Sequence, residues 1–258
     1  MKSFAGWVYT GKSKEKAFLQ DKFPTSENKY PPFIERIMRR RGIKKDEFES
    51  FLNPKKENLF PYHRWENLNK AIELIHWAVK GKKKIHIHSD YDVDGITSLS
   101  MLCAGIRQFG GDFSYTISNR FKGGYGIPEE IVENCFNNRC ELFVSLDCGT
   151  SSFSIHERLK RFKIPTLIID HHPLLEKPEP WVNLCNTHLK DCPEALSKLS
   201  SAGIVFKLLE GLYDSFNSKF PYNSFLRLTA LGLAQDIVEM LGENHSLVSL
   251  GMKEIPST

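Results

Sequence analysis

The sequence predicts an α/β fold, with a parallel five-stranded sheet, helices on both faces, and a small, mostly helical region before it. Two observations predict this fold. From Lys84 onward, short apolar runs alternate with segments of helical periodicity, as in repeated strand–helix–strand units. Before residue 81 only helical spacing is found. We therefore expect an N-terminal helical region over 1–80 and an α/β domain over 81–258.

Three helical signals lie in the N-terminal region, over 31–43, 44–54 and 67–82. A proline pair suits the opening of the first helix, and Gly42 suits its end. In the third, apolar residues recur three and four positions apart. Asn67 or Asn69 is expected to cap its start and Gly81 to end it.

Short apolar runs of the kind found in buried strands follow from Lys84. The predicted strands are 84–88, 113–118, 142–146, 165–169 and 181–185. The predicted helices are 95–109, 128–138 and 151–162 between the strands, and 201–214 and 222–234 after a loop over 186–200. This alternation places successive strands parallel to one another.

Bulk composition is that of a globular protein, with 41% hydrophobic and 26% charged residues among 258. No apolar run reaches the ~20 residues that a membrane span requires. The N-terminus lacks the apolar core of a signal peptide, so a cytoplasmic protein is expected. The net charge of +4, with basic clusters at 36–45 and 80–84, is compatible with a polyanionic partner or with a solvated face.

Six cysteines are spread along the chain and predict reduced thiols rather than a disulfide framework. Cys185, His188 and Cys192 have a spacing that suggests zinc. No fourth ligand has suitable local spacing, so zinc is the weaker alternative.

Acidic and imidazole side chains follow the predicted strands where each strand ends. The first strand runs into "HSDYDVDG", which crowds Asp90, Asp92 and Asp94 together. The third delivers Asp147, and the fourth ends in "DHH". Ligands bind beyond the carboxyl ends of parallel strands, and crowded carboxylates repel one another unless a cation relieves them.

Carboxylates with a minority of imidazoles suit manganese or magnesium better than zinc or copper. The number of candidate ligands leaves room for two divalent cations, a recurrent device for cleaving phosphoesters. Each residue also has a structural alternative, as a turn former, a helix cap or a surface group. His86, on the same strand as His88, is expected to be structural.

The motifs "DYDVDG", "LDCG" and "DHH" resemble those of the DHH phosphoesterase superfamily. The wider series "FESFLNP", "DYDVDGITS", "NRFKGGYGIP", "VSLDCGTSS", "IDHHPL", "SSAGIVFKLLEGL" and "TALGLAQDIVEM" resembles, in that order, the RecJ family from about residue 36 onward. That resemblance implies a hydrolase that degrades single-stranded DNA from its 5′ end, in DNA repair and recombination.

The resemblance also implies roles for residues. Two cations, manganese or magnesium, would be held by six ligands: His88, Asp92, Asp94, Asp147, His171 and Asp236. His172 would contact the scissile phosphate or protonate the leaving oxygen, and Asp170 and Asp90 would support the ligands. Asp236 lies in an apolar run, where an unpaired carboxylate is costly to bury; a cap for a helix starting at Ile237 is the alternative.

Nucleic-acid contacts are expected beside these ligands. Arg120 suits a phosphate, Tyr125 suits stacking on a base, and Gly124 with its neighbouring glycines allows close backbone approach. Ser201, at the start of a helix, could hold another phosphate, and His188 follows the fifth strand. A turn with a packed tyrosine is the alternative for the glycine-rich stretch. Partners expected from the family are single-stranded DNA and a single-strand-binding protein or helicase, with the chain a monomer.

The chain departs from the family in having no second catalytic-half domain, no glycine-rich "GGGH" motif and no oligonucleotide-binding domain. We therefore expect either the metal-binding half of a longer protein or a natural short form. Two other functions stay open: a DHH phosphodiesterase acting on short oligonucleotides or cyclic dinucleotides, and a non-enzymatic replication or repair scaffold. The filled metal positions weigh against the scaffold.

Overall fold

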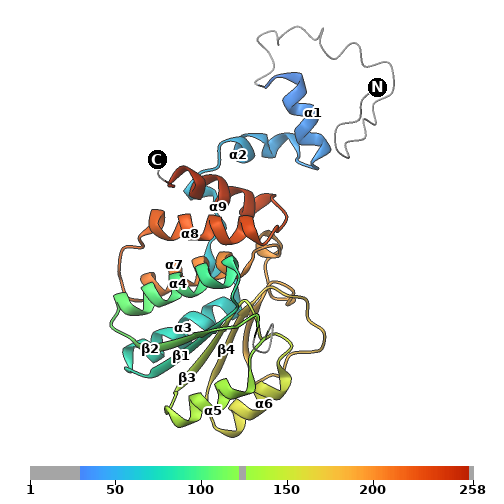
Figure 1. Cartoon of the computed structure of the whole chain (residues 1–258). Coiled ribbons are helices and arrows are strands. Elements are labelled where there is room, and N and C mark those ends of the chain that lie inside the picture. Colours follow the sequence, from blue (N-terminus) through green and yellow to red (C-terminus); the bar gives the residue numbers. More distant parts are fainter. Residues whose placement is uncertain (1–29, 122–125, 256–258) are drawn as a thin grey trace. The chain divides into compact units, whose positions relative to one another are not determined.

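Five parallel strands form one sheet in the order β2-β1-β3-β4-β5 (Figure 1). This computed structural model describes residues 30–121 and 126–255. The strands are β1 Lys84–Ser89, β2 Asp112–Ile117, β3 Leu142–Leu146, β4 Thr166–Asp170 and β5 Asn183–Asn186. All neighbouring pairs run parallel, which confirms the predicted sheet.

The strand order reverses direction at β1. From β1 the chain crosses to β2 on one side, and it then returns to β3 on the other side. At the carboxyl ends of these strands, Ser89 of β1 is in register with Leu146 of β3. Such a reversal leaves a crevice between the strand ends, and this crevice is the usual ligand position in a parallel α/β sheet.

Helices cover both faces of this sheet, as expected. They are α3 Glu66–Lys80, α4 Val93–Gln108, α5 Glu129–Asn137, α6 Phe153–Arg161, α7 Ser201–Ser215, α8 Tyr222–Gln235 and α9 Gly242–Lys253. One apolar core joins strand residues such as Ile85 and Ile87 to α3, α4 and α7. A second joins Phe143 and Ile168 to α5 and α6 on the opposite face (Figure 1). Side chains alternate between faces along a strand, so His86 and His88 lie on the α5 side.

Helix α9 was not predicted from the sequence. Its segment is half polar and lacks a strong apolar stripe, so its periodicity is weak. Packing forms it: Leu247 is fully buried, and Gly251 lies so close to α8 that an added Cβ would be 2.4 Å from the Leu226 carbonyl oxygen. Tertiary contact outweighs local propensity here.

The predicted cap of α3 was wrong, whereas its predicted end at Gly81 is correct. Trp65 occupies the N-cap position and makes no side-chain cap hydrogen bond. Asn67 lies inside the helix and donates to Asp191 through its side chain, and Asn69 donates to the His63 carbonyl. Burial of Trp65 fixes the helix start in place of a polar cap.

The chain divides into two compact units between Asn53 and Pro54. The sequence had suggested a boundary between residues 80 and 81. The division lies earlier because α3 contributes Leu68, Ile72 and Ile75 to the core of the sheet.

The first unit contains helices α1 Pro32–Arg40 and α2 Phe48–Leu52, with a 3₁₀ turn at Lys45–Glu47. Gly42 follows α1 with φ of +77°, the left-handed conformation that ends helices. Met38 and Phe48 are buried within the unit.

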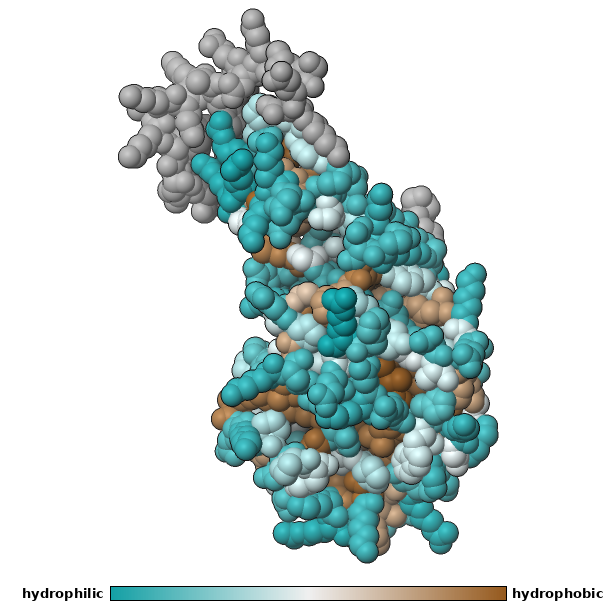
Figure 2. Space-filling view, turned by 180° about the vertical axis from the view of Figure 1, so that it is seen from behind, coloured by the Kyte–Doolittle hydropathy of each residue, from teal (hydrophilic) through white to brown (hydrophobic). Residues whose placement is uncertain are grey.

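The surface of the larger unit is mixed in character. The face drawn in Figure 2 shows mostly hydrophilic side chains, with hydrophobic patches between them. None of the described helices is long and apolar enough to cross a membrane.

Candidate functional site

Acidic and imidazole groups converge at the carboxyl edge of the sheet. Three sets have ligand atoms that all lie within 4.8 Å of one another: Asp90, Asp92 and Asp147; Asp147, His171 and His172; and Asp94, His171 and Asp236. They come from the ends of β1, β3 and β4, the start of α4 and the end of α8. The sets share Asp147 and His171, so the three form one continuous cluster.

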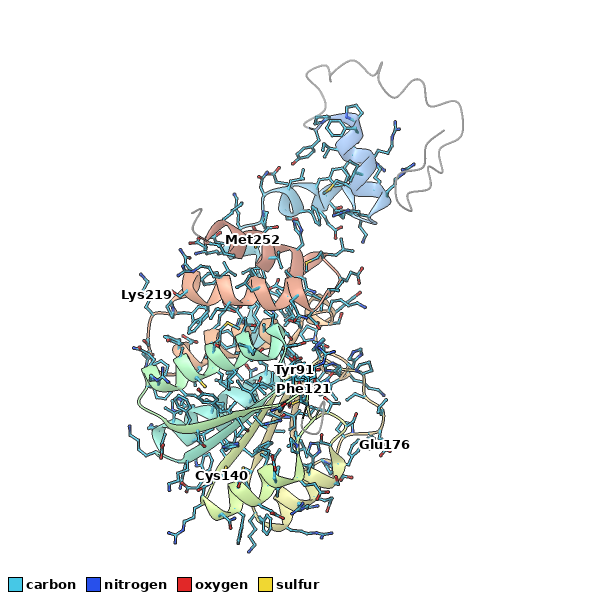
Figure 3. The ribbon with its side chains drawn as sticks, in the orientation of Figure 1. Tyr91, Phe121, Cys140, Glu176, Lys219 and Met252 are labelled. Atoms are coloured by element: carbon cyan, nitrogen blue, oxygen red, sulfur yellow. The ribbon has the colours of Figure 1, made fainter. Side chains whose placement is uncertain are left out.

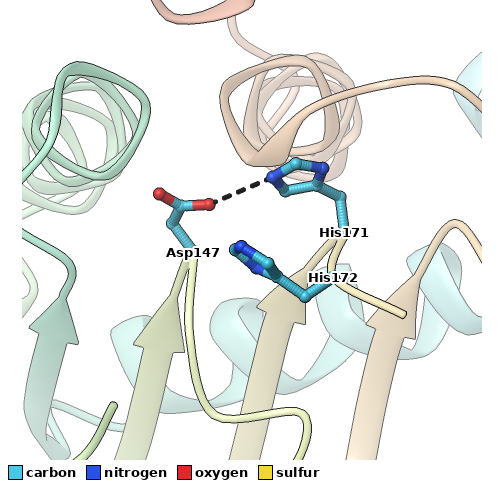
Figure 4. A group of neighbouring side chains, drawn as sticks. All are labelled: Asp147, His171 and His172. Carbon is cyan, nitrogen blue, oxygen red and sulfur yellow. Dashed lines mark ion pairs between the residues drawn. The ribbon is translucent and has the colours of Figure 1, made fainter. Parts of the chain in front are cut away.

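His171 stands at the centre of this cluster. Its Nε2 atom lies 3.4 Å from Asp147 Oδ1, 3.4 Å from Asp236 Oδ2 and 4.0 Å from Asp94 Oδ2. Figure 4 shows the contact with Asp147, and His172 beside it. The Nε2 atom is buried and makes no hydrogen bond within the described residues. Three carboxylates facing one unbonded imidazole nitrogen form a donor set that a divalent cation fits.

Asp147 adopts a backbone conformation that few residues tolerate. Its φ is +61°, in the left-handed region, where aspartate and asparagine are several-fold enriched among residues other than glycine. Its Oδ1 accepts a hydrogen bond of 3.1 Å from the Ser201 hydroxyl. Burial, together with the charges of Asp94 and Asp92, raises the pKa of Asp147 to about 10. A bound cation would favour the anionic form of this carboxylate.

Asp94 is fully buried and is held by the amino end of α7. Its carboxylate accepts hydrogen bonds from the Ser200 hydroxyl at 2.7 Å, the Ser201 amide at 2.8 Å and the Ala202 amide at 3.1 Å. The amino end of a helix favours negative charge, which offsets part of the cost of burial. Burial still raises the pKa of Asp94.

This arrangement bears on the expected phosphate contact of Ser201. Its amide and its hydroxyl both bond carboxylates of the cluster, Asp94 and Asp147. The helix start therefore holds carboxylates of the chain itself, and the expected contact of Ser201 with a phosphate stays a prediction.

Asp236 ends helix α8 as its C-cap residue. The alternative interpretation, a cap for a helix starting at Ile237, is wrong, because the described chain bends away there and Ile237 has φ of +55°. Burial raises the pKa of Asp236. The turn exposes Ile237 and directs the preceding carboxylate towards His171.

Asp90 and Asp92 form the ligand set that includes Asp147 but not His171. Asp92 caps α4, and its Oδ1 accepts from the Gly95 amide at 2.9 Å. Asp90 is buried, which raises its pKa, and its Oδ1 has no hydrogen-bond partner among the described residues. Asp92 and Asp94 thus fall in different sets, as expected for ligands of two ions.

Asp170 and His172 form a tight pair. Asp170 Oδ1 accepts from the amides of His171 and His172, at 2.8 and 3.1 Å, and from His172 Nδ1 at 2.7 Å. Burial opposes ionisation of Asp170, but its bond to His172 and the charge of that ring outweigh burial and lower its pKa to about 2. The same bond raises the pKa of His172.

The change Asp170→Asn is expected to lower the pKa of His172, because the neutral amide no longer stabilises the imidazolium. Measurement of the His172 pKa by NMR titration tests this. His156, a buried histidine of α6, is the internal control and should titrate as in the unchanged chain. An unaltered His172 pKa would contradict the pairing.

His88 does not join the described cluster. Its Nδ1 lies 2.9 Å from Thr116 Oγ1, and its Nε2 lies 3.2 Å from the Gly126 carbonyl oxygen. Both ring nitrogens therefore have protein partners, and its role as a ligand stays a prediction.

The expected nucleic-acid contacts are only partly described. Gly124 and Tyr125 lie outside the described residues, while Arg120 and His188 are exposed. Phe121, which the sequence interpretation did not single out, is 95% exposed after β2 and is labelled in Figure 3 together with Tyr91, which follows β1. The sequence signal that could have identified Phe121 is an aromatic residue in the segment that follows the predicted second strand.

The sequence analysis also did not identify two residues that hydrogen-bond the aspartates of the cluster. The Thr150 amide donates to Asp170 Oδ2, and Gln235 Oε1 accepts from the Asp94 amide. The alternative zinc ligands Cys185, His188 and Cys192 are not among the metal-binding sets formed by the described residues.

Close packing of α8 against Asp94 makes a glycine necessary. A Cβ at Gly232 would lie 2.7 Å from Asp94 Oδ1 and 2.6 Å from the Ala202 Cβ atom. We expect Gly232→Ala to destabilise the fold by about 1–3 kcal/mol and to weaken Mn²⁺ binding, because Asp94 must move. Urea unfolding and Mn²⁺ titration measure both effects. Leu231→Ala, at the neighbouring exposed position, is the control; equal losses in both variants would exclude a specific effect on Asp94.

Comparison with known proteins identifies a family, a relative and two similar solved structures. Residues 84–233 match the DHH family, N-terminal domain. The single-stranded-DNA-specific exonuclease RecJ of Escherichia coli (strain K12) is 28% identical over an alignment of 237 positions, which covers 87% of this chain and 40% of that protein. A crystal structure of exonuclease RecJ bound to manganese matches with a TM-score of 0.69 and 29% identity, over 74% of this chain and 49% of that one.

RecJ from Thermus thermophilus in complex with Mn²⁺ matches with a TM-score of 0.71 and 26% identity, over 86% of this chain and 31% of that one. The chain thus spans less than half the length of each of these relatives.

Proposed function

Because the chain belongs to the DHH family, we propose that it is the metal-binding half of a divalent-cation-dependent exonuclease that hydrolyses single-stranded DNA from the 5′ end. The observation that carries the proposal is the convergence of Asp94, Asp147 and Asp236 on His171 Nε2. The relatives named RecJ support the substrate and reaction class, and two of the matched structures contain manganese.

The residues present fit a pair of manganese or magnesium ions. His171 Nε2 and Asp90 Oδ1 are buried polar atoms without a hydrogen-bond partner among the described residues, as expected of groups facing a cation. Asp94, Asp147, His171 and Asp236 would hold one ion. Asp92 and Asp147 would hold the other, with His88 as its candidate imidazole ligand. When bound, such ions stabilise the charge that develops on a phosphoryl group.

His172 and Asp170 supply acid–base chemistry in this proposal. The 2.7 Å bond fixes the Nδ1 proton of His172 on the side of Asp170 and leaves Nε2 for the substrate. The raised pKa of His172 favours the protonated ring, which can donate its proton to a phosphate or leaving oxygen. Asp170 is a positioning residue, because its carboxylate is occupied by the amides and the ring that it orients.

Substrate binding would use groups around the same edge. Phe121 offers an exposed ring for base stacking, which tolerates any sequence, and Arg120 offers a guanidinium for phosphate. We further propose a role in DNA repair and recombination in the cytoplasm, with a single-strand-binding protein or helicase as partner.

The test is a cleavage assay with 5′- and 3′-labelled single- and double-stranded DNA, RNA and dinucleotides, in Mn²⁺, Mg²⁺ or chelator. Mononucleotides released from the 5′ end of single-stranded DNA, with a rate that falls steeply with salt, support the proposal. Activity on dinucleotides alone would assign the chain to small substrates. Metal binding without hydrolysis of any substrate would contradict an enzymatic role.

A further inference from the structure

A chain of hydrogen bonds runs along β1 and β2 on the face covered by α5. Ser114 Oγ lies 2.8 Å from His86 Nδ1, and His86 Nε2 lies 3.1 Å from Thr116 Oγ1. Thr116 Oγ1 lies 2.9 Å from His88 Nδ1, and His88 Nε2 lies 3.2 Å from the Gly126 carbonyl oxygen. The chain thus joins two imidazoles through one hydroxyl.

Both imidazoles are neutral. His86 is 9% and His88 1% exposed, and their hydrogen-bond partners are hydroxyls and a carbonyl rather than carboxylates. A buried imidazolium without an anionic partner is costly.

The Gly126 carbonyl at the end of this series of hydrogen bonds determines which group donates and which accepts in each of them. Because the Gly126 oxygen can only accept, His88 carries its proton on Nε2, and its Nδ1 accepts from the Thr116 hydroxyl. Thr116 Oγ1 then accepts from His86 Nε2, and His86 Nδ1 accepts from the Ser114 hydroxyl. Both rings are therefore Nε2–H tautomers.

A cation at His88 Nε2 requires the opposite arrangement. Ligation needs an unprotonated Nε2, so the remaining proton must lie on Nδ1 and be donated to Thr116. Hydroxyls and imidazoles can both donate and accept, so every hydrogen bond of the series can exchange its donor and its acceptor. One proton leaves His88 Nε2 for solvent at the site, and one enters at Ser114 from solvent in a cavity of about 400 Å³ that Ser114 and His86 line. Each ring and each hydroxyl keeps one proton throughout.

We propose that Thr116 and His86 are positioning residues that set which nitrogen of His88 is free to bind a cation, by reversing this chain when the cation binds. The inference rests on the proposed function only in taking His88 as a cation ligand. Ser118 adjoins the end of this hydrogen-bond chain, since its hydroxyl lies 3.2 Å from His88 Nε2 and 3.2 Å from the Gly126 carbonyl oxygen.

The first test is the affinity for Mn²⁺ alone, measured from the free-ion electron paramagnetic resonance signal. Thr116→Val keeps the shape but removes the hydroxyl, and we expect it to weaken binding about 10–100-fold, the usual cost of losing a partner of a ligand histidine. Thr116→Ser should restore binding. Thr166→Val is the control for removing a threonine hydroxyl from the sheet, since the Thr166 hydroxyl in β4 bonds the Ile164 carbonyl and no histidine. Unchanged Mn²⁺ affinity in Thr116→Val would overturn the proposal.

The second test needs no variant. Nitrogen-15 NMR of the metal-free chain should show both His86 and His88 as Nε2–H tautomers. A metal-free His88 protonated on Nδ1 would overturn the proposal even if Thr116→Val does not fold. A chain that shows these tautomers and the Thr116 dependence but cleaves no DNA supports this inference while contradicting the proposed nuclease.

Discussion

Asp147→Asn is expected to remove Mn²⁺-dependent hydrolysis, by at least about 1000-fold, and to abolish stabilisation of the chain by Mn²⁺. The asparagine keeps the left-handed backbone and can still accept from Ser201, so the fold should persist. The lost charge is the one shared between two ligand sets, and a loss of about 4 kcal/mol of charge stabilisation corresponds to this factor.

The same change should stabilise the metal-free chain, in a way that depends on pH. The pKa of Asp147 is about 10 in the folded chain, against about 3.9 when unfolded, so the folded state binds the extra proton between these values. Stability of the metal-free chain therefore falls as pH rises through this window. At pH 8 the variant should melt at a higher temperature than the unchanged chain, and the difference should shrink towards pH 4.

Thermal melts with and without Mn²⁺ at several pH values measure both effects. Asp112→Asn, an exposed aspartate at the start of β2, controls for the change in net charge and should respond to Mn²⁺ normally. A variant at position 147 that is still stabilised by Mn²⁺ would remove Asp147 from the metal centre.

Lys207→Met is expected to destabilise the fold by about 3–5 kcal/mol, which lowers the melting temperature by about 6–20 °C. The Lys207 side chain is 1% exposed and lies 2.8 Å from Glu243 Oε1 and 3.2 Å from Glu210 Oε2. Its ammonium also donates to the Phe60 carbonyl at 2.8 Å. Methionine fills the space but leaves two carboxylates without their cation.

The pH dependence of the stability of Lys207→Met identifies the cause of its destabilisation. Burial raises the pKa of Glu210 even beside Lys207, so removing the cation should make the variant recover stability as pH falls. The double variant Lys207→Met, Glu243→Gln should regain part of the loss. Lys198→Met, which breaks an exposed 3.8 Å pair with Glu239, should cost less than about 1 kcal/mol. Similar losses at positions 207 and 198 would show that burial of the pair is not decisive.

Much of the fold and the broad position of the site were predictable from local patterns. Strand runs and the residues directly after them are determined by short-range periodicity, and parallel strands bring their carboxyl ends to one edge. For that reason Asp92, Asp147 and His171 could be assigned to one cluster from their positions directly after strands. The Asp–His–His motif also resembles that of a known family, which the match over residues 84–233 confirms.

Other features depend on contacts that sequence patterns do not encode. The amides that hold Asp94 come from a helix more than a hundred positions further along the chain. Likewise, the cap of α3 was misassigned because burial of Trp65 replaces a polar cap. The partners of His88 lie on β2 and on the segment after it, and only the strand order brings them within reach.

The reversal of strand order at β1 has a consequence for folding. Candidate ligands lie on segments from β1 to the end of α8, so the centre exists only when the non-local strand pairings and the packing of α8 are complete. Closing such long loops is slow and comes late in folding. A divalent ion binds the finished centre and not the unfolded chain, so it acts only on the last, fully assembled state. Cation uptake therefore reports on complete folding, and a partly folded chain lacking α8 would be identified by its failure to bind the ion.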